Sequence, residues 1–307
     1  MLIKDPPAEI ADGLWMLGTT AYPIYLVRGD SESALVEGGL GAVAAIVIRQ
    51  IEQLGIDKAS VCLAVITHAH PDHVMALPLL HRVFPGIALV GSEPAAKALA
   101  VEKTLAFFRQ MDAAFTESLV EAGLVQPGDR PAPAEAGPIN FDGIVHEGDK
   151  LAVGGAGFTV LETPGHSECS ISLYEPKRRI LFISDASGYY MPQHAAWWPC
   201  YFTDYAAYLG SLKRLAALDT EVLCLSHNGA ITGAADVAEY FRGAIAATED
   251  YHRRIIGEIR AGRPARELAE QLGSEAYQQV RLLKPDFFQK NCMILVKQSL
   301  RHEGMKA

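Results

Sequence analysis

Short apolar runs separated by glycine and proline characterise the first third of the chain. Three of them predict β-strands, at residues 14–17, 24–28 and 34–37. The apolar positions of residues 42–54 recur partly at helical spacing and predict a helix. Two more strands are expected at residues 63–66 and 87–90, on either side of a helix that ends near Phe84. This alternation predicts a mixed α/β protein, built as a two-sheet sandwich flanked by helices.

The remainder of the chain mixes strand-like and helical patterns. Residues 93–123 predict one or two helices, and the four prolines of residues 126–138 predict a loop. Strands are expected to resume at residues 139–146, 151–153, 158–163, 179–184 and 222–226. Helices then follow at about 235–261, at 265–272 and from Pro285 through 299. We therefore expect a first domain over residues 1–235 and a helical extension over residues 236–307.

Three histidines and an aspartate lie within six residues, directly after the strand expected at 63–66. They are His68, His70, Asp72 and His73. Alternate side chains of an extended segment point the same way, so His68 and His70 can converge on one ion. Pro71 stops strand pairing and begins a turn, which directs Asp72 and His73 towards a second ion. The string predicts a metal site.

Three later strand-like runs also end in a potential ligand. His166 follows the run at 158–163, Asp185 the run at 179–184, and His227 the run at 222–226. A structural zinc would need about four ligands in a closed tetrahedron, whereas a hydrolytic site leaves a position open for water. The five cysteines form no Cys-x-x-Cys pair, so the sequence indicates neither a disulfide framework nor a cysteine zinc site.

In order and spacing, these seven residues resemble the ligand pattern of the metallo-β-lactamase superfamily. The resemblance covers about residues 13–235 and implies an αββα four-layer sandwich. It implies that His68, His70 and His166 hold one metal ion, that Asp72, His73 and His227 hold a second, and that Asp185 bridges them. It also suggests a catalytic role for Asp72, which would orient the nucleophile or pass its proton to the leaving group.

Other segments are similar to a thioesterase-like branch, the quinolone signal response group, which has a helical C-terminal extension. These segments are 34–39, 164–167 and 185–188, Trp198-Pro199 and the helix near 208–212. In such relatives the extension covers the active-site mouth. The candidates for a substrate pocket are therefore Tyr189, Trp197, Trp198, Phe287, Phe288 and Arg254. Ordinary packing of the aromatic side chains is the alternative.

Charge divides the chain into an acidic body and a basic tail. The formal net charge is −9, yet residues 251–307 carry 11 basic and 6 acidic side chains. This tail either docks on the acidic body or holds an anionic substrate through Arg253, Arg254, Arg260, Arg263 and Arg266. The acidic body disfavours nucleic acid as a partner. We expect neither a membrane span nor a signal peptide, and therefore predict a cytoplasmic protein without a membrane partner.

The ligand set predicts a binuclear hydrolase, in which two divalent ions per chain share a hydroxide that attacks the substrate. Zinc, iron and manganese all suit five imidazoles and two carboxylates. We expect a small-molecule substrate, first an anionic thioester such as an acyl-coenzyme A, with a lactone or a phosphodiester as alternatives. A regulatory or binding protein with a structural or residual metal site is the alternative of another class. The oligomeric state is open, with a homodimer as one alternative.

Overall fold

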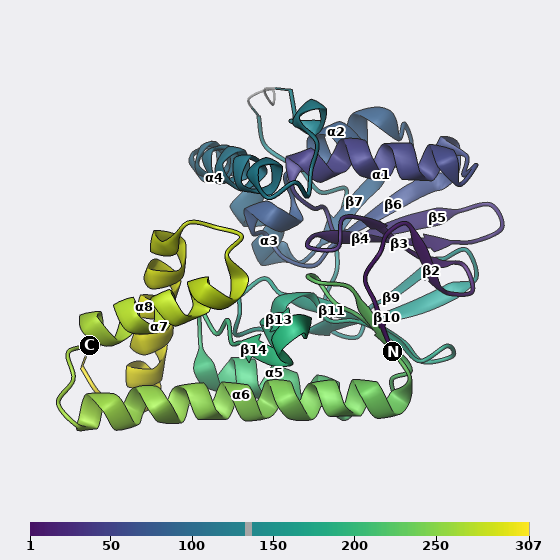
Figure 1. Ribbon diagram of the computed structural model, residues 1–307. Helices are drawn as coiled ribbons and strands as arrows, with labels where there is room; N and C mark the ends of the chain where they lie inside the picture. The colour runs from purple at the N-terminus through teal and green to yellow at the C-terminus, as the bar shows by residue number, and fades with distance from the viewer. Residues whose placement is uncertain (133–136, 307) are drawn as a thin grey trace. The chain divides into compact units, whose positions relative to one another are not determined.

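The structure, a computed structural model, describes residues 1–132 and 137–306. The chain divides into two compact units, which we describe separately (Figure 1). Unit 1 comprises residues 1–162, 169–184 and 219–237, and unit 2 comprises residues 163–168, 185–218 and 238–307. Unit 2 thus combines the C-terminal helices with two segments that the sequence analysis assigned to the first domain. A functional boundary at residue 235 stays a prediction.

Unit 1 contains two β-sheets. One has the strand order β2 (Ala8–Ala11), β3 (Leu14–Gly18), β4 (Pro23–Arg28), β5 (Ser33–Val36), β6 (Val61–Ile66), β7 (Ala88–Gly91) and β8 (Gly143–Ile144). The other has the order β1 (Leu2–Ile3), β16 (Ala230–Thr232), β15 (Val222–Cys224), β12 (Ile180–Phe182), β11 (Ile171–Glu175), β10 (Ala156–Glu162) and β9 (Lys150–Val153). Because β5 is parallel to β6, and β12 to β15, the chain leaves each pair at a common edge.

The two sheets of unit 1 pack face to face around one apolar core. Tyr25 of β4 and Phe182 of β12 meet there, with ring centroids 5.5 Å apart. Met16, Val65 and Val160 belong to the same buried cluster. Apolar side chains from one face of each sheet fill this space. The predicted α/β class with two sheets is confirmed.

Four α-helices of unit 1 follow one another in the first half of the chain. They are α1 (Gly41–Gln53), α2 (Leu77–Val83), α3 (Glu93–Leu99) and α4 (Glu102–Glu121). Helix α1 packs on the first sheet through β3 and also contacts α2 and α4 (Figure 1). Two 3₁₀ turns, η2 (Pro71–His73) and η4 (Ser184–Ser187), interrupt the chain where strands have just ended. Both turns carry predicted metal ligands.

Unit 2 is mainly helical. It holds the hairpin of β13 (Tyr189–Met191) and β14 (Ala196–Trp198), then α5 (Tyr205–Ala216), the part of α6 (Ala234–Arg260) after residue 237, α7 (Ala265–Val280) and α8 (Pro285–His302). Helices α7 and α8 pack closely, because Gly273 lies against the backbone of Gln289. A Cβ at Gly273 would approach the Cα of Gln289 to 2.5 Å. None of the helices within the described ranges is long and apolar enough to cross a membrane.

Two predicted elements differ clearly in extent from the observed ones, and one hairpin was not predicted. The strand expected at 139–146 contracts to β8, although Asp142 just before it still bonds to Leu89 of β7 through its amide and its carboxylate, both at 2.8 Å. The helix expected at 265–272 continues to Val280, because Gly273 serves helix packing and does not end the helix. Residues 189–198 form the hairpin of unit 2, which the sequence analysis did not predict. Residues 133–136 of the predicted loop lie outside the described residues.

Candidate metal centre

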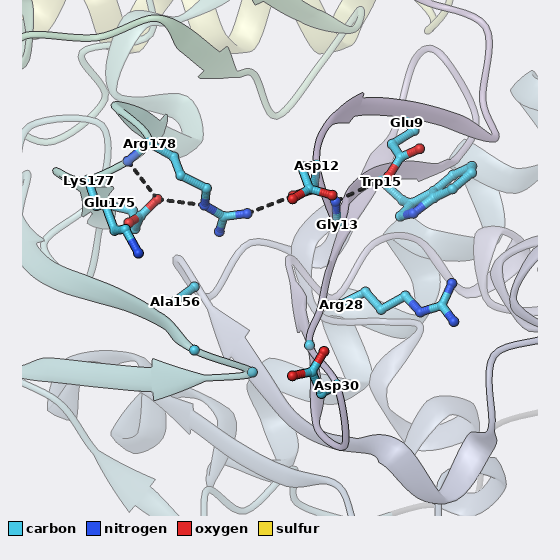
Figure 2. Close-up of a pocket in the computed structure, with 13 residues that line it drawn as sticks. Glu9, Asp12, Gly13, Trp15, Arg28, Asp30, Ala156, Glu175, Lys177 and Arg178 are labelled. Atoms are coloured by element: carbon cyan, nitrogen blue, oxygen red, sulfur yellow. Dashed lines mark hydrogen bonds and ion pairs between the residues drawn. The ribbon is translucent and has the colours of Figure 1, made fainter.

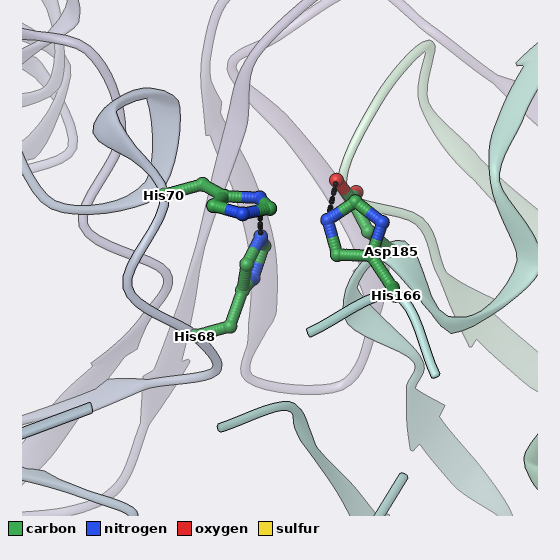
Figure 3. Close-up of side chains that lie close together, drawn as sticks. All are labelled: His68, His70, His166 and Asp185. Carbon is green, nitrogen blue, oxygen red and sulfur yellow. Dashed lines mark hydrogen bonds and ion pairs between the residues drawn. The ribbon is translucent and has the colours of Figure 1, made fainter. Parts of the chain in front are cut away.

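His68 and His70 follow β6 and point their ring nitrogens at each other. Nε2 of His68 lies 3.1 Å from Nδ1 of His70 (Figure 3). The Nδ1 atom of His68 lies 3.0 Å from the hydroxyl of Ser184, so its proton is placed on that side of the ring. Two nitrogens bound tetrahedrally to one zinc ion at 2.0–2.1 Å would be about 3.3 Å apart. The spacing of the two rings therefore suits a shared ion.

Asp72, His73 and His227 form a second group within unit 1. The three potential ligand atoms lie within 4.8 Å of one another. Oδ2 of Asp72 is 3.5 Å from Nε2 of His73 and 3.6 Å from Nε2 of His227. These separations are too long for good hydrogen bonds and close to the distance between two ligands of one ion. Turn η2 supplies the first two residues, and the end of β15 leads to the third.

A buried network behind these rings fixes their orientation. The Glu37 carboxylate receives the Thr67 hydroxyl on Oε1 and Nδ1 of His73 on Oε2, both at 2.8 Å. Nδ1 of His227 lies 2.9 Å from the carbonyl oxygen of Ala21. An imidazole that donates from Nδ1 keeps the lone pair of Nε2 for a metal ion. The hydrogen-bonded partners therefore prepare His73 and His227 as ligands.

The backbone around this network is strained at specific positions. Glu37 adopts a φ of 82°, Ser184 a φ of 52°, and Asn228, next to His227, a φ of 65°. Residues other than glycine rarely occupy this region, and it is found where the surrounding structure imposes it. The neighbouring Gly38 is required for close approach, since a Cβ there would lie 2.4 Å from the His73 carbonyl oxygen. This strained backbone holds Glu37 and His73 in the positions described above.

Unit 2 contains His166 and Asp185, which lie close to each other. Nε2 of His166 is 3.3 Å from Oδ2 of Asp185 (Figure 3). Nδ1 of His166 lies 2.9 Å from the carbonyl oxygen of Cys200, which again leaves Nε2 as the metal-binding nitrogen. Gly165 has a φ of 125° and packs on the backbone of Tyr208, so no side chain fits before His166. Both side chains are buried, His166 at 2% and Asp185 at 8% exposure.

The donor set fits divalent metal ions. Imidazole nitrogens with second partners on Nδ1, together with carboxylates, are ligands that zinc, iron and manganese share. Sequence reasoning found the ligand candidates but gave no metal-related role to Glu37, Thr67 or Ser184. The available signal was a glutamate at a strand end followed by two glycines, which occurs at residues 37–39.

The aromatic pocket candidates pack within unit 2. Trp198 and Phe288 are buried against each other, with ring centroids 5.3 Å apart. Trp197 covers Gly243 of α6, where a Cβ would lie 2.2 Å from the indole ring. Tyr189 and Phe287 are partly exposed. A role of these residues in a substrate pocket stays a prediction.

The tail arginines pair with acids of the same unit. Arg254 donates two hydrogen bonds to Glu275, at 2.7 and 2.9 Å, and so joins α6 to α7. The other pairs are Arg253–Asp250, Arg260–Glu303, Arg263–Glu258 and Arg266–Glu270. Each of the five arginines considered for binding an anionic substrate therefore has a carboxylate partner within unit 2.

A separate cavity of about 720 Å³ lies elsewhere in unit 1 (Figure 2). Arg178 crosses it, donating to Glu175 and to the carbonyl oxygen of Asp12, both at 2.8 Å. Trp15 and Arg28 also line it. The described lining includes none of the predicted site residues, so this cavity is not the candidate centre.

Asp112 of α4 gives unit 1 a pH-dependent stability. Its carboxylate is buried and accepts a hydrogen bond from the Gly41 amide at 2.8 Å. Burial raises the pKa of Asp112 from 3.8 to about 6; the Gly41 amide opposes this shift, and the charge of Asp72 adds to it. Because the folded state binds the proton more tightly than the unfolded state, stability falls as the pH rises from about 4 to 6.

We expect Asp112→Asn to remove this dependence in the metal-free protein. The asparagine still accepts from Gly41 and carries no charge. Its free energy of unfolding relative to wild type should therefore be higher at pH 8 than at pH 5, by about 1.4 kcal/mol. Urea denaturation of both proteins at the two pH values measures this difference, in which the titration of the histidines cancels. An equal difference at pH 5 and pH 8 contradicts the expectation.

Comparisons with known proteins agree with this geometry. The family model described as "Metallo-beta-lactamase superfamily" matches residues 17–227. Curated relatives include "Acyl-coenzyme A thioesterase MBLAC2" of Bos taurus, 28% identical over 223 residues, and of Homo sapiens, 27% identical over 223 residues. Each alignment covers 68% of this chain and 75% of the relative.

Solved structures share the fold. A metallo-beta-lactamase family protein of Thermus thermophilus has a TM-score of 0.66 and 22% identity, covering 96% of this chain and 95% of its own. The subclass B3 metallo-beta-lactamase BJP-1 of Bradyrhizobium japonicum has a TM-score of 0.57 and 20% identity, covering 83% of this chain and 95% of its own. At these identities the likeness establishes the fold alone.

Proposed function

We propose that this chain, which belongs to the metallo-beta-lactamase superfamily, hydrolyses thioesters of the acyl-coenzyme A type at a centre of two divalent metal ions. The observation that carries the proposal is that hydrogen bonds from the protein orient the candidate metal ligands. His73, His166 and His227 each have Nδ1 engaged by an oxygen of the protein, which directs Nε2 at a metal. A histidine cluster without a metal role would not need this arrangement three times.

The proposed ligand assignment follows the two groups of unit 1. His68, His70 and His166 would hold one ion, and Asp72, His73 and His227 the other, with Asp185 shared between them. This assignment requires unit 2 to present His166 and Asp185 to the histidines of unit 1. When bound, the ions would supply Lewis acidity and make water acidic enough to react near neutral pH.

Asp72 is proposed as the proton carrier. Its side chain is 19% exposed, whereas those of its neighbours His73 and His227 are 2% and 7% exposed. The carboxylate is thus the most solvent-accessible of the three groups, and its Oδ2 lies 3.5 Å from Nε2 of His73 and 3.6 Å from Nε2 of His227. It can therefore accept a proton from the attacking water and return it to the leaving group.

Two observations favour a thioester. The curated relatives that cover two thirds of this chain are named acyl-coenzyme A thioesterases. A thiolate also leaves readily, so a reactive water is sufficient and no serine or cysteine nucleophile is needed. The tail arginines give no further support, since they are paired with carboxylates.

A substrate panel tests the proposal. Purified protein, reconstituted with zinc, iron or manganese, would be assayed on acyl-coenzyme A thioesters, lactones and phosphodiesters. We expect kcat/KM for a thioester to exceed that for the other classes by at least about tenfold, which is 1.4 kcal/mol in the barrier. Asp185→Asn should abolish turnover. His81→Ala, which changes an exposed histidine of α2, should not affect it.

Each unexpected outcome has a distinct meaning. Efficient lactone or phosphodiester turnover without thioester turnover would overturn the substrate and keep the hydrolase. Full metal loading without turnover of any class would favour a binding protein. Elemental analysis after gel filtration should find fewer ions per chain in Asp185→Asn and in His70→Ala than in wild type, because each change removes a ligand of the proposed centre.

A further inference from the structure

A second cluster of potential ligands lies in unit 2, at the end of the C-terminal helix. His252 belongs to α6, His302 is the last residue of α8, and Glu303 follows as its C-cap. The potential ligand atoms of these three side chains all lie within 4.8 Å of one another. The residues lie 50 positions apart along the chain and meet only through helix packing. They are distinct from every residue proposed above as a ligand.

The distances within this cluster resemble those of a metal site. Nε2 of His252 is 3.5 Å from Oε1 of Glu303, near the separation of two ligands on one ion. The other carboxylate oxygen, Oε2, accepts a hydrogen bond from Arg260 at 2.8 Å. Arg260 therefore fixes the carboxylate and leaves Oε1 directed at His252. This is the role that a second hydrogen-bonding partner has behind a metal ligand.

An aromatic ring holds both imidazoles. Tyr205, the first residue of α5, stacks on His252 with ring centroids 4.0 Å apart and an angle of 18° between the planes. The same ring contacts His302 edge-on, at 4.9 Å and 65°. His252 and His302 are themselves 5.4 Å apart and nearly perpendicular. Tyr205 thus restricts the orientation of the two nitrogen donors before any ion binds.

An ion can reach this cluster from solvent. His252 and Glu303 line an open cavity of about 490 Å³. Two arginines border the cavity: Arg260 holds the Glu303 carboxylate through Oε2, and Arg253 pairs with Asp250 at 2.7 Å. Two imidazoles and one carboxylate are three protein ligands, which leaves a coordination position for water on a tetrahedral ion.

We propose that His252, His302 and Glu303 form a peripheral site for a zinc-type divalent ion, which joins the end of α8 to α6. The ion would bind ligands from both helices, so it would stabilise the packing of the C-terminal helix within unit 2. Such binding raises the stability of the folded chain according to the concentration and affinity of the ion. The site is separate from the proposed hydrolytic centre and takes no part in its chemistry.

Zinc binding to the full chain tests this proposal. Wild type, His302→Ala and His194→Ala would be titrated with Zn²⁺, and the bound zinc counted after equilibrium dialysis. His302 and His194 are both exposed histidines of unit 2, so the second variant is a matched control. We expect His302→Ala to bind one zinc ion fewer per chain than wild type, and His194→Ala to bind as many as wild type. The zinc-dependent rise in Tm should shrink only in His302→Ala.

Two further measurements keep the result interpretable. The Tm of His302→Ala in chelator should match that of wild type in chelator, which shows that the variant folds. Glu303→Gln, which keeps the size of the side chain, should weaken zinc binding at the same site. Equal zinc counts in wild type and His302→Ala would overturn the proposal, as would an equal loss in His194→Ala. Hydrolytic activity does not enter these readouts, so failure of the proposed function would leave them unchanged.

Discussion

Asp72→Asn is expected to lower kcat by about 10²–10⁴-fold, the range associated with loss of a positioned proton carrier. The amide keeps the size of the side chain and one oxygen for a metal ion, but it cannot accept a proton. Because Oδ2 of Asp72 faces both His73 and His227, at 3.5 and 3.6 Å, some loss of metal is expected as well. Steady-state kinetics on an acyl-coenzyme A thioester, with metal content measured on the same sample, separate the two effects.

The kinetic constants of Asp72→Asn distinguish a proton carrier from a residue that only binds metal. If Asp72 carries a proton, kcat falls in fully metal-loaded protein, KM changes little, and the pH profile loses one limb. If Asp72 is only a ligand, activity falls in proportion to the lost metal and returns when metal is added. Asp5→Asn, at an exposed position near the N-terminus, is the surface control and should behave as wild type. Wild-type kcat in metal-loaded Asp72→Asn would exclude the proposed role.

Local pattern was a good guide to the elements of this fold and a poorer guide to their ends. The helix expected at 42–54 is α1, which buries one face, and the strand expected at 24–28 is β4, whose apolar run is buried on both faces up to Val27. The ends of other elements depend on contacts that a local window cannot contain. Gly273, for example, lies within α7 at the contact with Gln289 of α8, and only the packed helices show why a glycine stands there.

The candidate site shows the same contrast between features that a local sequence pattern predicts and features that depend on distant contacts. Candidate ligands such as His70 and Asp72 could be proposed from the sequence because they follow a strand within a few residues. The support behind them was not, since Ser184 reaches Thr67 across 117 positions of the chain and Glu37 reaches it across 30. No periodicity encodes such partners. The positive φ of Glu37 and Ser184 is also invisible in a sequence, because the surrounding structure, and not residue type, imposes it.

Glu37→Gln is expected to weaken metal binding by about 10–100-fold, the usual effect of losing a partner behind a metal ligand. The carboxylate accepts from Thr67 on one oxygen and from His73 on the other, both at 2.8 Å. Glutamine has one acceptor oxygen and an amide that only donates, so one of these two partners must lose its acceptor. Loss of the acceptor for Nδ1 leaves the His73 imidazole less firmly oriented and less basic, and therefore a weaker metal ligand. Competition with a chromophoric chelator measures the change in affinity.

Glu175→Gln is the matched control for this experiment. Glu175 is as deeply buried as Glu37, at 2% against 4% exposure, and lies in the same unit, but its carboxylate faces Arg178 at 2.8 Å. Glu175→Gln loses that ion pair and should lower the stability of the protein without changing its metal affinity. Glu37→Gln should instead change the metal affinity. Its stability without metal should fall little, because the substitution removes a buried charge. Equal effects of the two variants on metal affinity would show that burial of a carboxylate matters here, and not its bond to His73.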